Sequence, residues 1–531
     1  MAQPQTQPGA LGIHIPDEIF LKIFESMCFH CKHPGDLPNA DTEGVREDKA
    51  TLARLCRVSR HFRSMAQPVL YHYYATGNCK HFLPRGVPYY EVPGDNDHLL
   101  SFATTLTTRP DLAAEVVSMQ LVNHPGGYRE YHEDDQVAAL KALLRWSDSH
   151  RALSVLRLEQ PLDAWCDNTD LPADWRSHAH RWVMSLAMIL AVRVRDVVVA
   201  VDDDEEQDFR DLQLFLELGD PAHTPKILAL RTLGMMSWGS NPYHLASMRG
   251  LLRAAPNLET ITAVDSCDSL WWNEQSPWDF KTYVPMLKVK KVVISNLYPQ
   301  NLSRFLVRTP GLEELEYYWQ IFPQRDTELY DHLCPAKDTL KRLTVSFLPW
   351  PACDLGSQPW FWYDFVDAKV QPIESLAEFT RLEDVTIDYR TLYREDDEDE
   401  ADRLTRFLPT SIRHFRIAYV AGDMTEALRD LAAAVEHTFT KLASVTIGVP
   451  KWPDGTPDHV SAMRWMVEPL FRGQGIRFAW VEDNLGPQVH TVLPGATKPG
   501  LTLLPWKEEV VEEAMEEEEV VEEEVVDDGE E

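Results

Sequence analysis

LEELEY, residues 312–317, is the clearest copy of a short pattern with apolar residues at its first, fourth and sixth positions. Other segments with the same spacing are LETITA (258–263), LKRLTV (340–345), LEDVTI (382–387) and LASVTI (442–447). In each copy the leading leucine can pack inward, and the fourth and sixth residues point to the same face of a short strand. The copies therefore predict a row of similar strands.

Weaker copies begin at Val116, Leu153, Val194, Leu230, Val289 and Ile412. Amphipathic segments such as HLASMRGLLRAAP (244–256) and MTEALRDLAAAVEHT (424–438) lie between copies and suit helices. This alternation resembles a leucine-rich repeat, and the resemblance implies a curved α/β solenoid over residues 116–505. The spacing is uneven, from 23 residues after Val289 to 42 after Leu340, so we expect an irregular solenoid. A nonrepetitive α/β domain is the alternative.

A helix is predicted near the N-terminus over IPDEIFLKIFESM, residues 15–27. Pro16 suits the first helical position, and the acidic residues after it suit the positive end of the helix dipole. Ile19 and Ile23 lie on one apolar stripe, and Phe20 and Phe24 form a second stripe beside it. So short a helix cannot bury both stripes by itself.

A second helical segment follows in ATLARLCRVSRHFRSMAQPVLYHYY, residues 50–74. Leu52 and Leu55 fall on one face of it, with Val58 and Phe62 beside them, and Pro68 is expected to stop the helical pattern. Ser59 can cap a third helix. Three short helices leave apolar surface for another protein, although an ordinary helical hairpin at the edge of a larger domain is the alternative.

The two segments together resemble the F-box family. The matching residues are Ile15, Pro16, Glu18, Ile19, Ile23 and Phe24, then Leu55, Val58, Ser59, Arg60, Phe62, Arg63, Met65, Ala66, Pro68, Leu70 and Tyr71. The resemblance implies a three-helix module that binds the adaptor of an SCF-type cullin-RING ubiquitin ligase and, through it, the cullin. The expected adaptor contacts, or their immediate support, are Pro16, Ile19, Ile23, Phe24, Leu52, Leu55, Val58 and Phe62.

The predicted fold class is thus α/β, with a three-helix F-box, an irregular leucine-rich-repeat-like solenoid and an acidic disordered tail. The predicted boundaries are a disordered leader at 1–12, the F-box at 13–75, a linker at 76–115, the solenoid at 116–505 and the tail at 506–531. The tail repels itself and has little to bury beyond paired valines, so it is expected to aid solubility or to contact a basic partner.

The composition of the chain limits its possible partners and its location in the cell. The chain of 531 residues carries a net charge of -33, which argues against nucleic acid or an anionic membrane as a partner. Its longest apolar run, from Trp182, is too short to span a bilayer. Eight scattered cysteines suit a reducing compartment, so a cytoplasmic or nuclear location is expected.

Catalytic activity and metal binding have weak support in the sequence. Gly-rich phosphate loops, nucleophile elbows and His-Glu-x-x-His helices are missing, so no catalytic or cofactor-binding residue is predicted, although an unrecognised hydrolase stays open. CFHCKH offers Cys28, His30, Cys31 and His33 as zinc ligands. A second ligand pair does not follow at a standard spacing, so no metal is predicted.

The repeat half is expected to bind a protein substrate of unknown identity. Aromatic residues crowd the segments that follow several predicted strands, and they either contact the substrate or fill gaps between irregular repeats. The candidate substrate contacts are Trp271, Trp272, Trp319, Trp350, Trp360 and Trp362. The predicted function is that of a ubiquitin-ligase substrate receptor, with an interaction scaffold lacking any ligase role as the alternative.

Overall fold

The structure is a computed structural model, in which the chain divides into two units, Met1–Ala496 and Thr497–Glu531. It describes residues 15–34, 43–75, 98–123, 134–149, 173–201, 225–237, 243–264, 266–267, 286–295, 297, 299–318, 329–346, 372–393, 400–420, 422–450 and 458–483. The second unit, and with it the predicted tail at 506–531, lies outside these residues. The predicted leader at 1–12 lies outside them as well.

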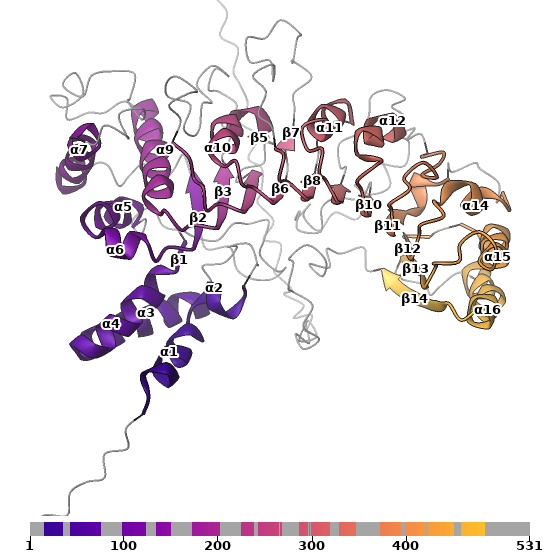
Figure 1. Ribbon diagram of the computed structural model, residues 1–531, viewed down its shortest axis with the longest axis horizontal. Helices are drawn as coiled ribbons and strands as arrows, with labels where there is room; N and C mark the ends of the chain where they lie inside the picture. The colour runs from indigo at the N-terminus through magenta and orange to yellow at the C-terminus, as the bar shows by residue number, and fades with distance from the viewer. Residues whose placement is uncertain are drawn as a thin grey trace, which may run out of the picture. The chain divides into compact units, whose positions relative to one another are not determined.

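A parallel sheet of 12 strands forms the centre of the first unit, and its strands stand side by side in chain order (Figure 1). The strands are β1 (Tyr73–Ala75), β2 (Ser118–Asn123), β3 (Asp196–Val201), β4 (Thr232–Ser237), β6 (Thr260–Val264), β8 (Lys291–Ser295), β9 (Glu314–Tyr318), β10 (Arg342–Ser346), β11 (Asp384–Asp388), β12 (His414–Ala418), β13 (Ser444–Pro450) and β14 (Arg477–Asp483). A separate pair joins β5 (Tyr243–His244) to β7 (Ser266–Cys267). The described strands that follow the copies of the repeating pattern therefore all lie in one sheet.

Helices connect these strands. They are α5 (Leu99–Thr108), α6 (Pro110–Ala113), α7 (Asp134–Ser149), α9 (Ala173–Leu190), α10 (Arg249–Ala254), α11 (Pro299–Leu306), α12 (Leu329–Leu333), α14 (Arg403–Phe407), α15 (Thr425–Ala434) and α16 (Asp458–Gly473). Short 3-10 helices are η7 (Leu245–Met248), η8 (Cys334–Ala336) and η10 (Tyr389–Thr391). Figure 1 shows α10, α11, α12, α15 and α16 along the same side of the strands. Within the described residues, each helix is too short or too polar to cross a bilayer.

The core lies between this helical side and the strands. In β9, Leu315 and Tyr317 are buried on the core side, whereas Glu314 and Glu316 alternate with them. The parallel register places equivalent apolar residues next to one another across seven strands: Val292, Leu315, Leu343, Val385, Phe415, Val445 and Phe478. Each such side chain contributes about 1.5–3 kcal/mol when it is fully buried. The repeated pattern thus builds one continuous core.

The N-terminal region differs from the predicted fold. Its described residues form α1 (Asp17–Glu25), α2 (Phe29–Lys32), α3 (Glu43–Val58) and α4 (Arg60–Tyr71), followed directly by β1. The prediction of a three-helix F-box followed by an irregular solenoid is therefore wrong. Four helices occur in this part of the described chain. In the whole of the described chain, every strand except β5 and β7 belongs to one parallel sheet, and this sheet includes β1.

Local hydrogen bonds explain this difference. The extra helix α2 closes where the Lys32 amide donates to the Cys28 carbonyl at 3.0 Å. Pro68 lies inside α4 and does not end it. At the end of α4, the His72 carbonyl accepts hydrogen bonds from the amides of Val117 and Ser118 at 3.0 and 2.9 Å. These bonds draw the chain after α4 into the sheet, and α5 and α6 occupy part of the range predicted as a linker.

Candidate functional site

The two apolar stripes of α1 have different environments. Phe24 is buried, and Phe20 and Phe24 both contact Phe62 of α4, with ring centroids 5.2 and 5.9 Å apart. This aromatic stripe faces the other helices and forms part of a small core with Leu52. The stripe therefore supplies the internal packing that holds α1 in place.

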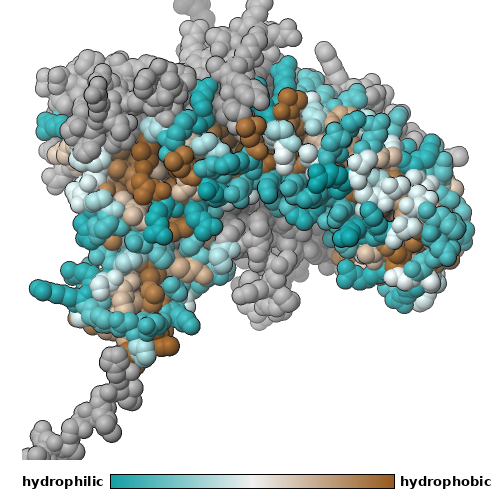
Figure 2. All heavy atoms as spheres, in the orientation of Figure 1, coloured by the Kyte–Doolittle hydropathy of each residue, from teal (hydrophilic) through white to brown (hydrophobic). Residues whose placement is uncertain are grey.

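The aliphatic stripe of α1 faces solvent. Ile19 is 47% exposed and Ile23 is 44% exposed, and Ile15 and Pro16 at the start of the helix are exposed as well. Val58, at the end of α3, is 65% exposed. Figure 2 shows hydrophobic residues gathered near the start of α1. Exposed apolar residues that cluster in this way are typical of a protein-binding surface.

Polar contacts fix this surface on the neighbouring helices. His61 Nε2 of α4 lies 3.0 Å from Asp17 Oδ1 of α1. Between α3 and α4, the Ser59 hydroxyl accepts a hydrogen bond from the Phe62 amide at 3.1 Å and caps α4. Arg63 Nε donates to the Cys56 carbonyl at 3.0 Å across the same junction. The region around Val58 is thus tied to the helix that holds α1.

The predicted adaptor-binding residues fall into three groups by exposure. Those exposed enough to contact a partner are Pro16, Ile19, Ile23 and Val58, those that are half-buried are Leu55 and Phe62, and those that are buried are Phe24 and Leu52. The buried and half-buried residues can support such a surface through packing. Exposure could not be assigned from the sequence, because both stripes of α1 are equally apolar.

A second group of candidate side chains gathers at α2. Cys28 precedes this helix, His30 and Cys31 lie within it, and His72 follows α4. The possible ligand atoms of these four residues all lie within 4.8 Å of one another. Cys31 Sγ is 3.4 Å from His72 Nδ1 and 3.9 Å from His30 Nδ1. Together they offer two sulfur and two nitrogen atoms.

The electrostatics of this cluster favour one thiolate. The Cys31 thiol donates a hydrogen bond to the Cys28 sulfur, which lowers the pKa of Cys28 to about 4 despite its burial. The same contact raises the pKa of Cys31. Burial lowers the pKa of His30, so its imidazole is favoured in the neutral form that can offer a nitrogen lone pair.

His33, the fourth candidate in the sequence motif, lies elsewhere. Its side chain is exposed, and its ring is tilted by 42° against that of Phe29, with the ring centroids 5.2 Å apart. His72 takes the fourth position in the cluster although it is 41 residues from Cys31. Local spacing could not reveal that ligand, because the approach depends on how α4 packs beside α2.

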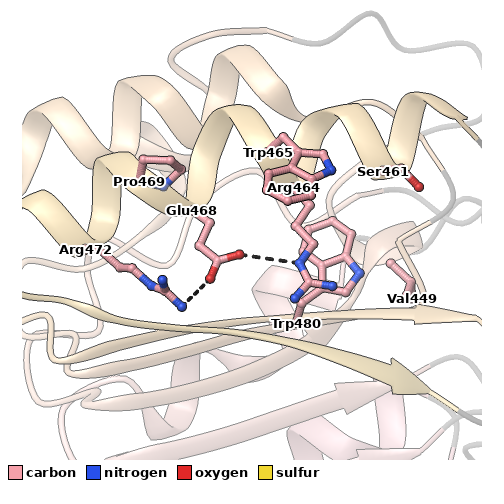
Figure 3. Close-up of a pocket in the computed structure, with 8 residues that line it drawn as sticks. All are labelled: Val449, Ser461, Arg464, Trp465, Glu468, Pro469, Arg472 and Trp480. Atoms are coloured by element: carbon pink, nitrogen blue, oxygen red, sulfur yellow. Dashed lines mark hydrogen bonds and ion pairs between the residues drawn. The ribbon is translucent and has the colours of Figure 1, made fainter.

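A third feature is a cavity of about 950 Å³ at the last two strands. It is lined by Val449, Ser461, Arg464, Trp465, Glu468, Pro469, Arg472 and Trp480. Figure 3 shows Arg464, Glu468 and Arg472 projecting from α16 toward the strand that carries Trp480. Glu468 pairs with Arg464 at 3.4 Å and with Arg472 at 2.5 Å. The cavity therefore combines an aromatic floor with charges that already have partners.

The candidate substrate-binding tryptophans Trp271, Trp272, Trp319, Trp350, Trp360 and Trp362 all lie outside the described residues. By contrast, Trp465 on α16 is 80% exposed, and it was not predicted as a contact. An aromatic residue that lies on a polar amphipathic helix gives no clear signal in the sequence.

A comparison with known protein families and with curated proteins found no match to this chain. Functional assignment therefore rests on the residues themselves.

Proposed function

We propose that this chain is a substrate receptor of an SCF-type cullin-RING ubiquitin ligase and that it binds the ligase adaptor through the exposed face of α1. The observation that carries the proposal is the exposure of Ile19, Ile23 and Val58. These three residues also occupy apolar positions of the F-box sequence pattern. A residue pattern and an otherwise unexplained apolar surface thus point to the same kind of partner.

The proposed mechanism is proximity. The adaptor links the chain to the cullin, and the half that contains the sheet holds a protein substrate near the activated ubiquitin carrier. Holding two reactants together raises their effective concentration, so the receptor needs no catalytic residue of its own. This role places the chain in the cytoplasm or the nucleus, and the free thiols of Cys28 and Cys56 suit such a reducing compartment.

The α1 surface can contribute measurably to the free energy of adaptor binding. Fully burying an isoleucine side chain contributes about 1.5–3 kcal/mol, and Ile19 and Ile23 are each already about half covered. Their further burial against an adaptor would therefore contribute about 1 kcal/mol each. Loss of both changes the dissociation constant by more than tenfold, since every 1.4 kcal/mol is a factor of ten.

Binding of the purified full chain to a purified SCF adaptor tests the proposal directly. The test variant carries Ile19→Glu and Ile23→Glu, which place charges on the exposed stripe and leave Phe24 intact. The matched control is Leu21→Glu, because Leu21 is 39% exposed on the same helix but lies off the stripe. We expect the double variant to bind at least about tenfold more weakly, and the control to bind like the wild type.

Two results would contradict this proposal. Failure of the folded wild-type chain to bind any SCF adaptor would favour an interaction scaffold with no ligase role. Equal loss of binding in Leu21→Glu and in the double variant would move the contact away from the Ile19 stripe. Circular dichroism of each variant establishes that the helices are retained.

A further inference from the structure

We infer that Cys28, His30, Cys31 and His72 form a zinc-binding site that fastens α2 to the end of α4. All four ligand atoms lie within 4.8 Å of one another, and the residues come from two segments of the chain. The proposed ion is structural, and it is independent of any adaptor or substrate.

The donor set fits zinc. Two thiolates and two imidazoles form one of the common tetrahedral arrangements of structural zinc sites. With Zn–S bonds near 2.3 Å and Zn–N bonds near 2.0 Å, the ligand atoms of such a site lie about 3.3–3.8 Å apart. The observed separation of 3.4 Å between Cys31 Sγ and His72 Nδ1 already falls in this range. Small side-chain rotations bring the remaining atoms into it.

The surroundings of His72 orient its ring for this role. Its Nδ1 atom faces Cys31, whereas Nε2 lies 3.9 Å from Glu115 Oε2. A zinc-bound histidine commonly directs its other ring nitrogen at a carboxylate, which fixes the ring and strengthens the ligand. The Glu115 carboxylate also lies 4.0 Å from the Arg193 guanidinium, and this second ion pair helps to fix its position.

A redox-active thiol pair is the rival interpretation of Cys28 and Cys31. Reactive cysteines lie in partly exposed positions that a partner can reach, whereas buried cysteines are inert. The Cys28 side chain is buried and that of Cys31 is half-buried, and ring nitrogens of His30 and His72 lie within 4.8 Å of both sulfur atoms. A dithiol switch needs neither histidine, but a tetrahedral metal site uses both.

The position of the site indicates what the ion does. α2 has four residues and no side-chain hydrogen bond at its N-cap, so its own backbone bonds give it little stability. His72 lies where α4 ends, and its carbonyl accepts hydrogen bonds from Val117 and Ser118. An ion shared by Cys31 and His72 therefore ties the short helix to the junction between the N-terminal helices and the sheet.

Zinc binding by the purified full chain tests this inference. The metal content is measured by mass spectrometry, and the affinity by competition with a chromogenic chelator. Cobalt(II) is the second probe, because its visible absorption reports tetrahedral thiolate coordination in the folded wild type. We expect one zinc per chain, a tetrahedral cobalt spectrum, and a lower melting temperature after removal of the ion by a chelator.

Paired substitutions locate the ligands. Cys31→Ser and His72→Gln should each weaken zinc binding by about tenfold or more, since even the loss of an outer-shell partner costs 10–100-fold. The matched controls are Cys56→Ser in α3 and His33→Gln just after α2, which replace the same residue types outside the cluster. Both controls should keep the affinity of the wild type.

Three outcomes would overturn the inference. The first is a folded wild-type chain that takes up neither zinc nor cobalt at one molar equivalent. The second is an octahedral cobalt spectrum without thiolate bands. This result comes from the wild-type chain alone and does not depend on whether any variant folds. The third is a loss of affinity in His33→Gln equal to that in His72→Gln, which would restore the local sequence motif as the ligand set.

Discussion

Phe62 of α4 lies edge-on against Phe20 of α1, with ring centroids 5.2 Å apart and an angle of 63° between the rings. Phe24 meets the same ring at 5.9 Å. This three-ring contact decides which apolar stripe of α1 is buried. It leaves Ile19 and Ile23 on the exposed face.

Phe24→Ala should destabilise the N-terminal helices far more than Ile23→Ala. Phe24 is buried, and truncation of such a side chain costs about 3–5 kcal/mol through lost burial and the cavity left behind. Ile23 is 44% exposed, so its truncation should cost about 1 kcal/mol or less. Hydrogen exchange of the amides in α1 and α4 measures both losses. Equal protection in the two variants would show that the aromatic stripe is not the internal one.

Much of the sheet could be predicted from the sequence. Where the structure describes them, the strands begin two residues after the first position of each copy of the pattern: β9 begins at Glu314 after Leu312, and β3 begins at Asp196 after Val194. The pattern is strong because alternate residues such as Leu315 and Tyr317 must enter one core. The copy at Leu153 lies outside the described residues.

Other features depended on contacts that sequence spacing cannot show. β1 has no copy of the pattern, and it joins the sheet where the His72 carbonyl accepts hydrogen bonds from the amides at the start of β2, those of Val117 and Ser118. His72 reaches the cysteines by the same packing, so the sequence motif could offer three of the four residues of the cluster but not the fourth. The two stripes of α1 were visible, but the ring of Phe62 was needed to tell the inner stripe from the outer one.

Glu316→Gln should reduce the free energy of unfolding by about 1–3 kcal/mol. Glu316 Oε1 on β9 lies 2.8 Å from Lys291 Nζ on β8, and both side chains are mostly buried. Removing the carboxylate leaves the ammonium group poorly compensated, because the other nearby carboxylate, that of Glu314, is 3.9 Å away. Urea denaturation measures the change.

The control for this pair is Glu426→Gln on α15. Glu426 pairs with Arg429 at 2.6 Å, but both side chains are about half exposed. Exposed pairs of this kind contribute about 0.3–0.5 kcal/mol, so the control should lose little stability. A loss in Glu426→Gln as large as that in Glu316→Gln would show that burial does not distinguish the two pairs.

The stability of the chain should fall on mild acidification, and His332 on α12 should contribute to this loss. Burial lowers the pKa of His332 below its ordinary value of 6.5, although the nearby Asp331 opposes the shift. The unfolded chain therefore takes up this proton more readily than the folded chain does. The contribution is fully present above pH 6.5 and is lost as the pH falls through the folded-state pKa.

Substitution of His332 by Gln removes the titrating group and keeps a polar side chain. We expect the difference between the unfolding free energies at pH 7.5 and pH 5.5 to be smaller in this variant than in the wild type. Urea denaturation at both pH values measures it. Parallel losses in the two proteins would contradict the assignment of this acid sensitivity to His332.

Truncation of the two tryptophans of the cavity at α16 should reduce stability by very different amounts. Trp480 on β14 is half-buried and packs against the core, with its ring 6.4 Å from that of Phe478. Trp480→Ala should therefore cost about 2–3 kcal/mol, below the 3–5 kcal/mol of a fully buried aromatic residue. Trp465 is 80% exposed, so Trp465→Ala should change stability by no more than about 0.5 kcal/mol. Chemical denaturation followed by far-ultraviolet circular dichroism compares the two variants, because this signal comes mainly from the backbone and reports unfolding in both. A large loss in Trp465→Ala would mean that its indole supports the fold of α16 and is not free to meet a partner.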